Sequence, residues 1–140
     1  WLIRRFIDPA ARFAFAEQSP ASSKAVPFDM YDVDFSHHAD LCTFEVLCQR
    51  FGIKDPAVTR LGRLVHDLDL KESRYNVPEA AAVGLLIDGL RQTYSRDDEL
   101  LEHGVVLFEA LYRALRAGRL DRRHPSESAW IGDRTCMQGN

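Results

Sequence analysis

The sequence lacks the features that mark membrane, secreted and nucleic-acid-binding proteins. No apolar run is long enough to span a bilayer, and there is no signal-peptide pattern. The three cysteines, Cys42, Cys48 and Cys136, are an odd number at unrelated spacings, which does not make a disulfide framework. A net charge of −3 gives no general attraction to nucleic acid or anionic lipid. We therefore expect a cytoplasmic domain with no membrane partner, and we do not expect this domain alone to bind nucleic acid.

Common catalytic and phosphate-binding motifs are also missing. No Gly-rich phosphate loop, nucleophile elbow or Cys-x-x-Cys pair is present. The composition is ordinary for a globular protein, with 46% hydrophobic and 28% charged residues. A length of 140 residues suits one domain with a hydrophobic core and is too short for two. Function has to be sought in clusters of reactive side chains.

Hydrophobic periodicity and helix-end signals predict a mainly helical body. The predicted helices cover about 40–51, 56–70, 78–94 and 95–117. Asp40 is the expected N-cap of the first, and Asp55-Pro56 combines a capping carboxylate with proline at the first helical position. Gly52 and Gly118 are the expected C-terminal stops.

Three short segments before these helices are typical of β-strands. Residues 12–17 alternate, with Phe13 and Phe15 on one face, and residues 26–28 and 33–35 are further candidates. The expected fold is therefore α+β, a mainly helical single domain with a small two- or three-stranded β element. The domain should cover 1–118, with a polar tail at 119–140. The apolar residues in 2–7 fit a helix, which we expect to begin upstream of this sequence.

Two short segments are rich in side chains that bind metals or transfer protons. Residues 36–45 contain His38, Cys42 and Glu45, and residues 65–71 contain His66 and Asp69. Within each predicted helix, the two residues three apart lie together on one flank of the apolar face. The short connection 52–55 forces an antiparallel pair of helices, which brings both segments to the open end of the hairpin.

This convergence predicts a metal site. Imidazole and carboxylate ligands spaced i, i+3 can share one ion, and a pair from the facing helix would complete a four-ligand shell. We expect Glu45, His66 and Asp69 as first ligands, followed by Cys42 and His38, and zinc, iron or manganese as the divalent ion. In a metal-free alternative, Cys42 is a small buried hydrophobe, the two acids are solvated and His66 is a hydrogen-bonded residue at a helix end.

A second predicted chemistry is oxyanion binding. Arg4 and Arg5 could present guanidinium groups to a tetrahedral anion. Arginines flanked by apolar residues also commonly pair with surface acids, so this alternative stays open at this point.

Several segments together resemble the chromate-resistance family of the ChrB type, in its C-terminal domain. The matching segments span about residues 1–117 and comprise 1–9, 26–29, 42–45, 65–71, 78–81 and the last helix. The resemblance implies an association with bacterial chromate resistance, commonly beside a chromate efflux transporter. Some members of that family act as chromate-responsive regulators.

Three functions follow for consideration. The first is a sensory or regulatory domain that binds a metal ion or a chromate-like oxyanion. The second is a metal-dependent enzyme, hydrolytic or redox, that uses the same cluster. The third is a metal-free interaction domain whose helical faces form a homodimer surface.

Overall fold

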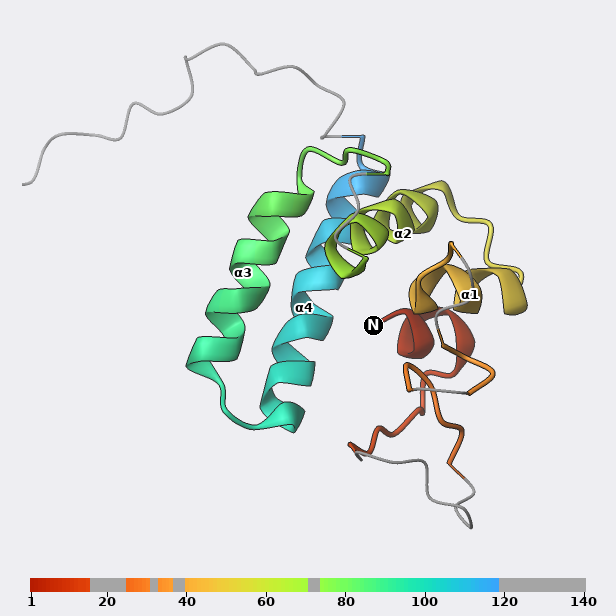
Figure 1. Ribbon diagram of the computed structural model, residues 1–140, viewed down its shortest axis with the longest axis vertical. Coiled ribbons are helices and arrows are strands. Elements are labelled where there is room, and N and C mark those ends of the chain that lie inside the picture. Colours follow the sequence, from red (N-terminus) through yellow and green to blue (C-terminus); the bar gives the residue numbers. More distant parts are fainter. Residues whose placement is uncertain (16–24, 31–32, 37–39, 71–73, 119–140) are drawn as a thin grey trace, which may run out of the picture.

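The body of the protein is built from α-helices. The computed structural model describes residues 1–15, 25–30, 33–36, 40–70 and 74–118. Within these residues a short π-helix, η1 (Ile3–Ile7), precedes α1 (Thr43–Arg50), α2 (Pro56–Asp69), α3 (Ala80–Thr93) and α4 (Asp97–Arg116). Helices α3 and α4 form a hairpin, α2 crosses it near one end, and α1 and η1 lie on the other side of α2 (Figure 1). The predicted tail at 119–140 lies outside the described residues.

The helix ends follow the predicted signals closely. Asp55 caps α2 by accepting hydrogen bonds from the backbone N–H groups of Ala57 and Val58, and Pro56 occupies the first turn. Gly52 and Gly118 follow α1 and α4 in left-handed conformations, each with φ of 63°, which glycine adopts without steric cost. The expected cap of α1 was wrong, because that helix begins at Thr43 and its N-cap is Cys42.

The predicted β element is absent from the described residues, so the α+β expectation was wrong. Of the three candidate segments, only Phe28 and Phe35 pair, in an isolated parallel bridge. Asp29 follows Phe28 with φ of 54°, a left-handed conformation that turns the chain away from an extended path. The alternating phenylalanines instead make aromatic contacts, with the Phe13 ring 6.0 Å from the Phe28 ring. Within the described residues, the alternation of these side chains is therefore not accompanied by a ladder of backbone hydrogen bonds between strands.

The hydrophobic core has two joined parts. The larger one is centred on Leu61 and Val58 of α2, and the smaller one on Leu64 of α2 and Val83 of α3. Leu111 of α4 packs against both parts, which makes the core continuous. Helix α2 contacts each of the other three α-helices and is the central element of the fold. No helix in the described ranges has the length and apolar character that crossing a bilayer requires.

The N-terminal segment is fixed to α4 by an aromatic cluster. The Trp1 ring lies 5.6 Å from Phe6 and 5.2 Å from Tyr112, in tilted or edge-on geometry. The Trp1 indole N–H donates to the carboxylate of Glu109 over 2.8 Å. The Tyr112 hydroxyl in turn donates to Asp55 over 2.9 Å, so one carboxylate links the start of α2 to α4.

Asp55 should give the protein an acid-sensitive component of stability. Burial raises the pKa of this carboxyl, but hydrogen bonds from Val58, Tyr112 and Ala57 outweigh it and hold the pKa below 3.8. A depressed native pKa stabilises the fold above the unfolded value, and that contribution is lost as pH falls through the native pKa. Asp55→Asn keeps the cap but cannot titrate. In urea unfolding from about pH 6 to pH 3, the stability gap between wild type and variant should therefore shrink on acidification. A gap that does not change with pH would contradict this role.

Candidate metal site

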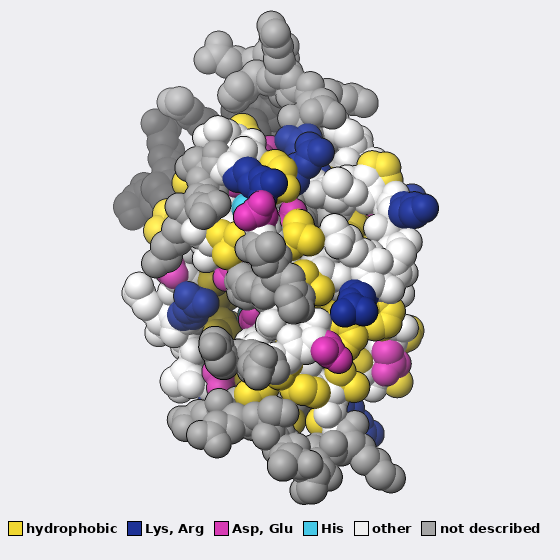
Figure 2. Space-filling model, turned by 45° about the vertical axis from the view of Figure 1, so that its right-hand side comes forward, with side chains coloured by type: hydrophobic (Ala, Val, Ile, Leu, Met, Phe, Trp, Pro, Cys, Tyr) yellow, Lys and Arg dark blue, Asp and Glu magenta, His cyan; other side chains and the backbone are white. Residues whose placement is uncertain are grey.

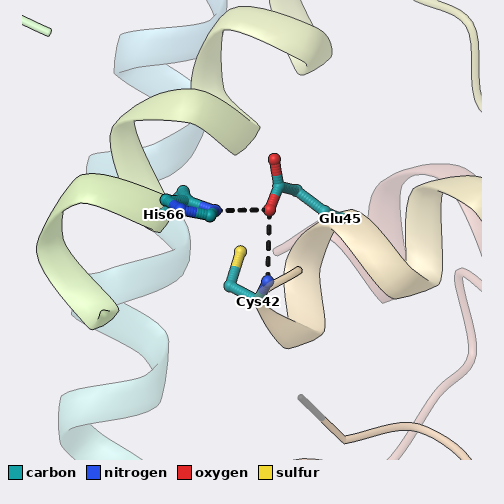
Figure 3. Close-up of side chains that lie close together, drawn as sticks. All are labelled: Cys42, Glu45 and His66. Carbon is teal, nitrogen blue, oxygen red and sulfur yellow. Dashed lines mark hydrogen bonds and ion pairs between the residues drawn. The ribbon is translucent and has the colours of Figure 1, made fainter. Parts of the chain in front are cut away.

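Three side chains from two helices meet at the open end of the α1–α2 hairpin. Cys42 immediately precedes α1, Glu45 lies in its first turn, and His66 lies in the last turn of α2. One potential ligand atom from each residue lies within 4.8 Å of the other two. Figure 3 shows the Cys42 sulfur and the Glu45 carboxylate turned toward the imidazole of His66. The predicted convergence of these three residues is therefore present in the structure.

A capping box at the start of α1 positions two of the three groups. Cys42 is the N-cap and Glu45 is the third helical residue. The Oε2 atom of Glu45 accepts a hydrogen bond from the Cys42 backbone N–H over 3.1 Å. In return, the Cys42 side chain accepts the backbone N–H of Glu45. These two interactions satisfy N–H groups that an α-helix leaves unpaired, and they hold the carboxylate beside the thiol. The local sequence Cys-Thr-Phe-Glu thus builds half of the site.

His66 brings the second helix into the site. Its side chain is 0% exposed, and its Nδ1 atom lies 2.7 Å from Oε2 of Glu45. The other ring nitrogen, Nε2, is buried and has no hydrogen-bond partner within the described ranges. One turn earlier, Gly62 faces Phe44 and Glu45 across the helix interface. A buried imidazole in short contact with a carboxylate therefore joins the two helices.

Two further residues support the site and were not predicted. The Tyr75 hydroxyl donates to Oε1 of Glu45 over 3.2 Å, and the tyrosine ring meets the His66 ring edge-on at 5.0 Å. Asp67 accepts hydrogen bonds from the backbone N–H groups of Tyr75 and Val77 at 3.0 and 2.8 Å. Asp67 therefore holds the segment that places Tyr75 over the cluster. The position of Asp67 next to His66 in the sequence could have indicated a role at the site, whereas no pattern in the sequence pointed to Tyr75.

The pKa shifts at the site favour a neutral Cys42 thiol and an ionised Glu45 carboxylate. Burial raises the pKa of the Cys42 thiol from 9.0 to about 12, and the Glu45 charge adds to that effect. Burial also raises the pKa of Glu45, but hydrogen bonds from His66 and from the Cys42 backbone outweigh it and bring the pKa below 4.5. Burial and then the Glu45 charge raise the pKa of Tyr75. Without a cation, the thiol keeps its proton at neutral pH.

The donor set fits a transition-metal ion. Sulfur, imidazole nitrogen and carboxylate oxygen are the three donor types that zinc uses, and the sulfur disfavours calcium and magnesium. A bound dication would lower the thiol pKa by direct coordination and would offset the burial cost of the thiolate. Three protein ligands leave one position of a tetrahedral shell, which the Tyr75 oxygen or a solvent molecule could take.

The remaining predicted ligands are placed differently. Asp69 is exposed and is not part of the three-residue group. His38 lies outside the described residues. The predicted anion ligands Arg4 and Arg5 sit beside carboxylates, with Arg4 2.8 Å from Glu102 and Arg5 3.6 Å from Glu109. Their binding of an oxyanion stays a prediction, and the anion would compete with these two carboxylates.

Cys42 should be inert to alkylation in the folded, metal-free protein. The thiolate is the reactive form, and both burial and the raised pKa of Cys42 suppress it. Iodoacetamide at neutral pH, followed by peptide mass spectrometry, should leave Cys42 unmodified until urea unfolds the protein. Alkylation of folded Cys42 at the rate found in urea would contradict the buried position.

Comparison with known proteins places the chain in a family. The family described as ChrB, C-terminal domain, matches residues 1–115. Protein ChrB of Cupriavidus metallidurans is 37% identical over 114 residues, which cover 80% of this chain and 35% of that protein. The chain thus spans about a third of the length of this relative. No solved structure matches significantly. The chain belongs to the ChrB C-terminal-domain family, the chromate-resistance family that its segments resemble.

Proposed function

We propose that this domain binds one divalent metal ion through Cys42, Glu45 and His66 and serves as a sensory or regulatory unit in the cytoplasmic response to chromate. The single observation that carries the proposal is the convergence of sulfur, oxygen and nitrogen ligand atoms within 4.8 Å. Family membership supports the link to chromate. Zinc or iron suits this donor set better than manganese, which prefers oxygen ligands.

The burial of the cluster favours a sensory or structural metal over a catalytic one. Cys42 and His66 are 0% exposed, and the Glu45 side chain is 15% exposed. A catalytic ion needs an open position that a substrate can reach. Two surface grooves in the described part of the protein have volumes of about 430 and 630 Å³, and none of the three ligand candidates lines either of them. The enzymatic alternative therefore has less support.

A metal also accounts for the combination of groups better than packing alone. A buried carboxylate–imidazole pair costs desolvation, and its net contribution to stability is often small. The thiol beside that pair has a pKa raised to about 12, so it stays protonated and adds only a weak S–H hydrogen bond to Glu45. The same three groups gain a large favourable interaction when a cation replaces the shared protons.

Metal binding is tested by titrating the purified protein with Co²⁺ and Zn²⁺. We expect one equivalent to bind, with a sulfur-to-cobalt charge-transfer band in the near ultraviolet that Zn²⁺ abolishes. Cys42→Ser should remove that band, and Glu45→Gln or His66→Asn should weaken binding by roughly a hundredfold or more, because each removes a direct ligand. Binding should also raise the thermal unfolding temperature.

Cys48→Ser is the matched control, because Cys48 lies on the same helix and outside the cluster. Asp69→Asn tests a further predicted ligand, and little effect is expected from its exposed position. Cobalt bound without a thiolate band, or equal losses in Cys42→Ser and Cys48→Ser, would contradict the assignment. No binding of either metal at micromolar concentrations would remove the proposal altogether.

The regulatory role requires a separate measurement in cells. In bacteria that depend on the full-length protein for chromate tolerance, Cys42→Ser and His66→Asn should abolish chromate-induced expression of the resistance genes. Cys48→Ser should preserve it. Induction that survives in a variant shown to have lost metal would separate metal binding from chromate sensing and would argue against the regulatory role.

A further inference from the structure

A groove of about 630 Å³ runs between α2 and the segment that leads into α3. Tyr75 lines this groove and also contacts the metal candidate Glu45 through its hydroxyl, whereas none of the three metal candidates lines the groove. The other lining residues are Lys54, Pro56, Thr59, Arg60, Arg63, Asn76, Val77 and Pro78. Its volume is in the range of small-molecule binding sites.

The charges that line this groove are all positive. Lys54, Arg60 and Arg63 contribute cations, and no carboxylate lines it within the described residues, although the whole chain has a net charge of −3. The two acids that flank the lining segments in the sequence, Asp55 and Glu79, already have partners. Asp55 accepts the N–H groups of α2 and the Tyr112 hydroxyl, and Glu79 pairs with Arg60 over 3.0 Å. Lys54 and Arg63 therefore give the groove an excess of positive charge.

Arg63 lies over an aromatic ring, which restricts its side chain before any ligand binds. Its guanidinium carbon lies 5.6 Å from the centre of the Tyr75 ring. Stacking on an aromatic face leaves the N–H edges of a guanidinium directed outward, and it reduces the entropy lost when those edges bind an oxyanion. The Tyr75 ring is held in turn, because Asp67 anchors the Tyr75 backbone N–H and Glu45 accepts its hydroxyl.

On the face shown in Figure 2, Lys and Arg side chains are scattered among acidic and apolar ones rather than gathered in a continuous stripe. A phosphate backbone needs a continuous basic track, so a compact anion is the better match for the local excess of positive charge from Lys54 and Arg63. The apolar walls from Pro56, Val77 and Pro78 would accept a nonpolar group attached to that anion.

We infer that the groove between Lys54, Arg63 and Tyr75 binds a phosphate- or sulfate-type oxyanion group, either as a free ion or as part of a small organic ester. This site shares no residue with the metal candidates, so its test does not depend on whether metal binds. It also differs from the Arg4–Arg5 position, where both guanidinium groups already face carboxylates.

The test uses two probes, inorganic phosphate and phenyl phosphate, with phenol as the uncharged control. Backbone amide NMR shifts during titration should change and saturate at Lys54, Arg63 and the 75–77 segment. Lys54→Gln combined with Arg63→Gln should weaken binding about tenfold or more, because each cation supplies a charge-assisted hydrogen bond. Tighter binding of phenyl phosphate than of phosphate, with phenol silent, supports the ester; equal binding supports the free ion.

Arg91→Gln is the matched control, since it removes the same charge from an exposed position on α3. Loss of the Arg63–Tyr75 contact could disturb the fold of the double variant. The single variant Lys54→Gln changes only an exposed residue and leaves that contact intact, and it should weaken binding by several-fold. The inference is overturned if neither probe gives saturable shifts at the groove, if the shifts centre on Arg4 and Arg5, or if Arg91→Gln weakens binding as much as the double variant.

Discussion

The short connection between α1 and α2 is the constraint on which the rest of the structure depends. Gly52 ends α1 in a conformation that glycine adopts without cost, and three residues later Asp55 starts α2. The same carboxylate accepts the Tyr112 hydroxyl, which fixes the hairpin against α4. With both ends set in this way, the start of α1 must lie opposite the end of α2. The contact between Glu45 and His66 follows from that register.

Helix α2 combines three tasks because its sides face different environments. One side carries Val58, Leu61 and Leu64 into the core. Its last turn supplies His66 to the metal candidates, and its exposed arginine, Arg63, lines the cationic groove. Because α2 packs against α1, α3 and α4, its position is fixed on several sides. A site with three converging ligands requires such a fixed support.

Tyr75 connects the two sites through one side chain. Its hydroxyl contacts Glu45, its ring packs edge-on against His66, and the Arg63 guanidinium lies over the same ring. Tyr75 lies in the segment that leads into α3. Asp67 of α2 fixes this segment by accepting the backbone N–H groups of Tyr75 and Val77. Occupation of either site would therefore change the surroundings of a residue that the other site also uses. Coupling between them would need a measured change in one affinity on filling the other.

The sequence by itself determined the four α-helices and the convergence of three candidate ligands. Caps, glycine stops and apolar periodicity are local signals, so they located α2 to within a residue and paired Cys42 and Glu45 with His66. Asp69 has the same spacing from His66 as Glu45 has from Cys42, yet it is exposed, because burial depends on how the helices pack together and not on spacing along one helix.

Only the tertiary structure decided the remaining features. Phe13 and Phe15 alternate as in a strand, but within the described residues only Phe28 and Phe35 form a bridge, and the left-handed Asp29 beside it is not encoded in the hydrophobic pattern. Tyr75 reaches Glu45 across a separation of 30 residues, a contact that no local signal carries. Long-range packing sets such contacts, because it depends on where whole helices dock rather than on the spacing of residues along one of them.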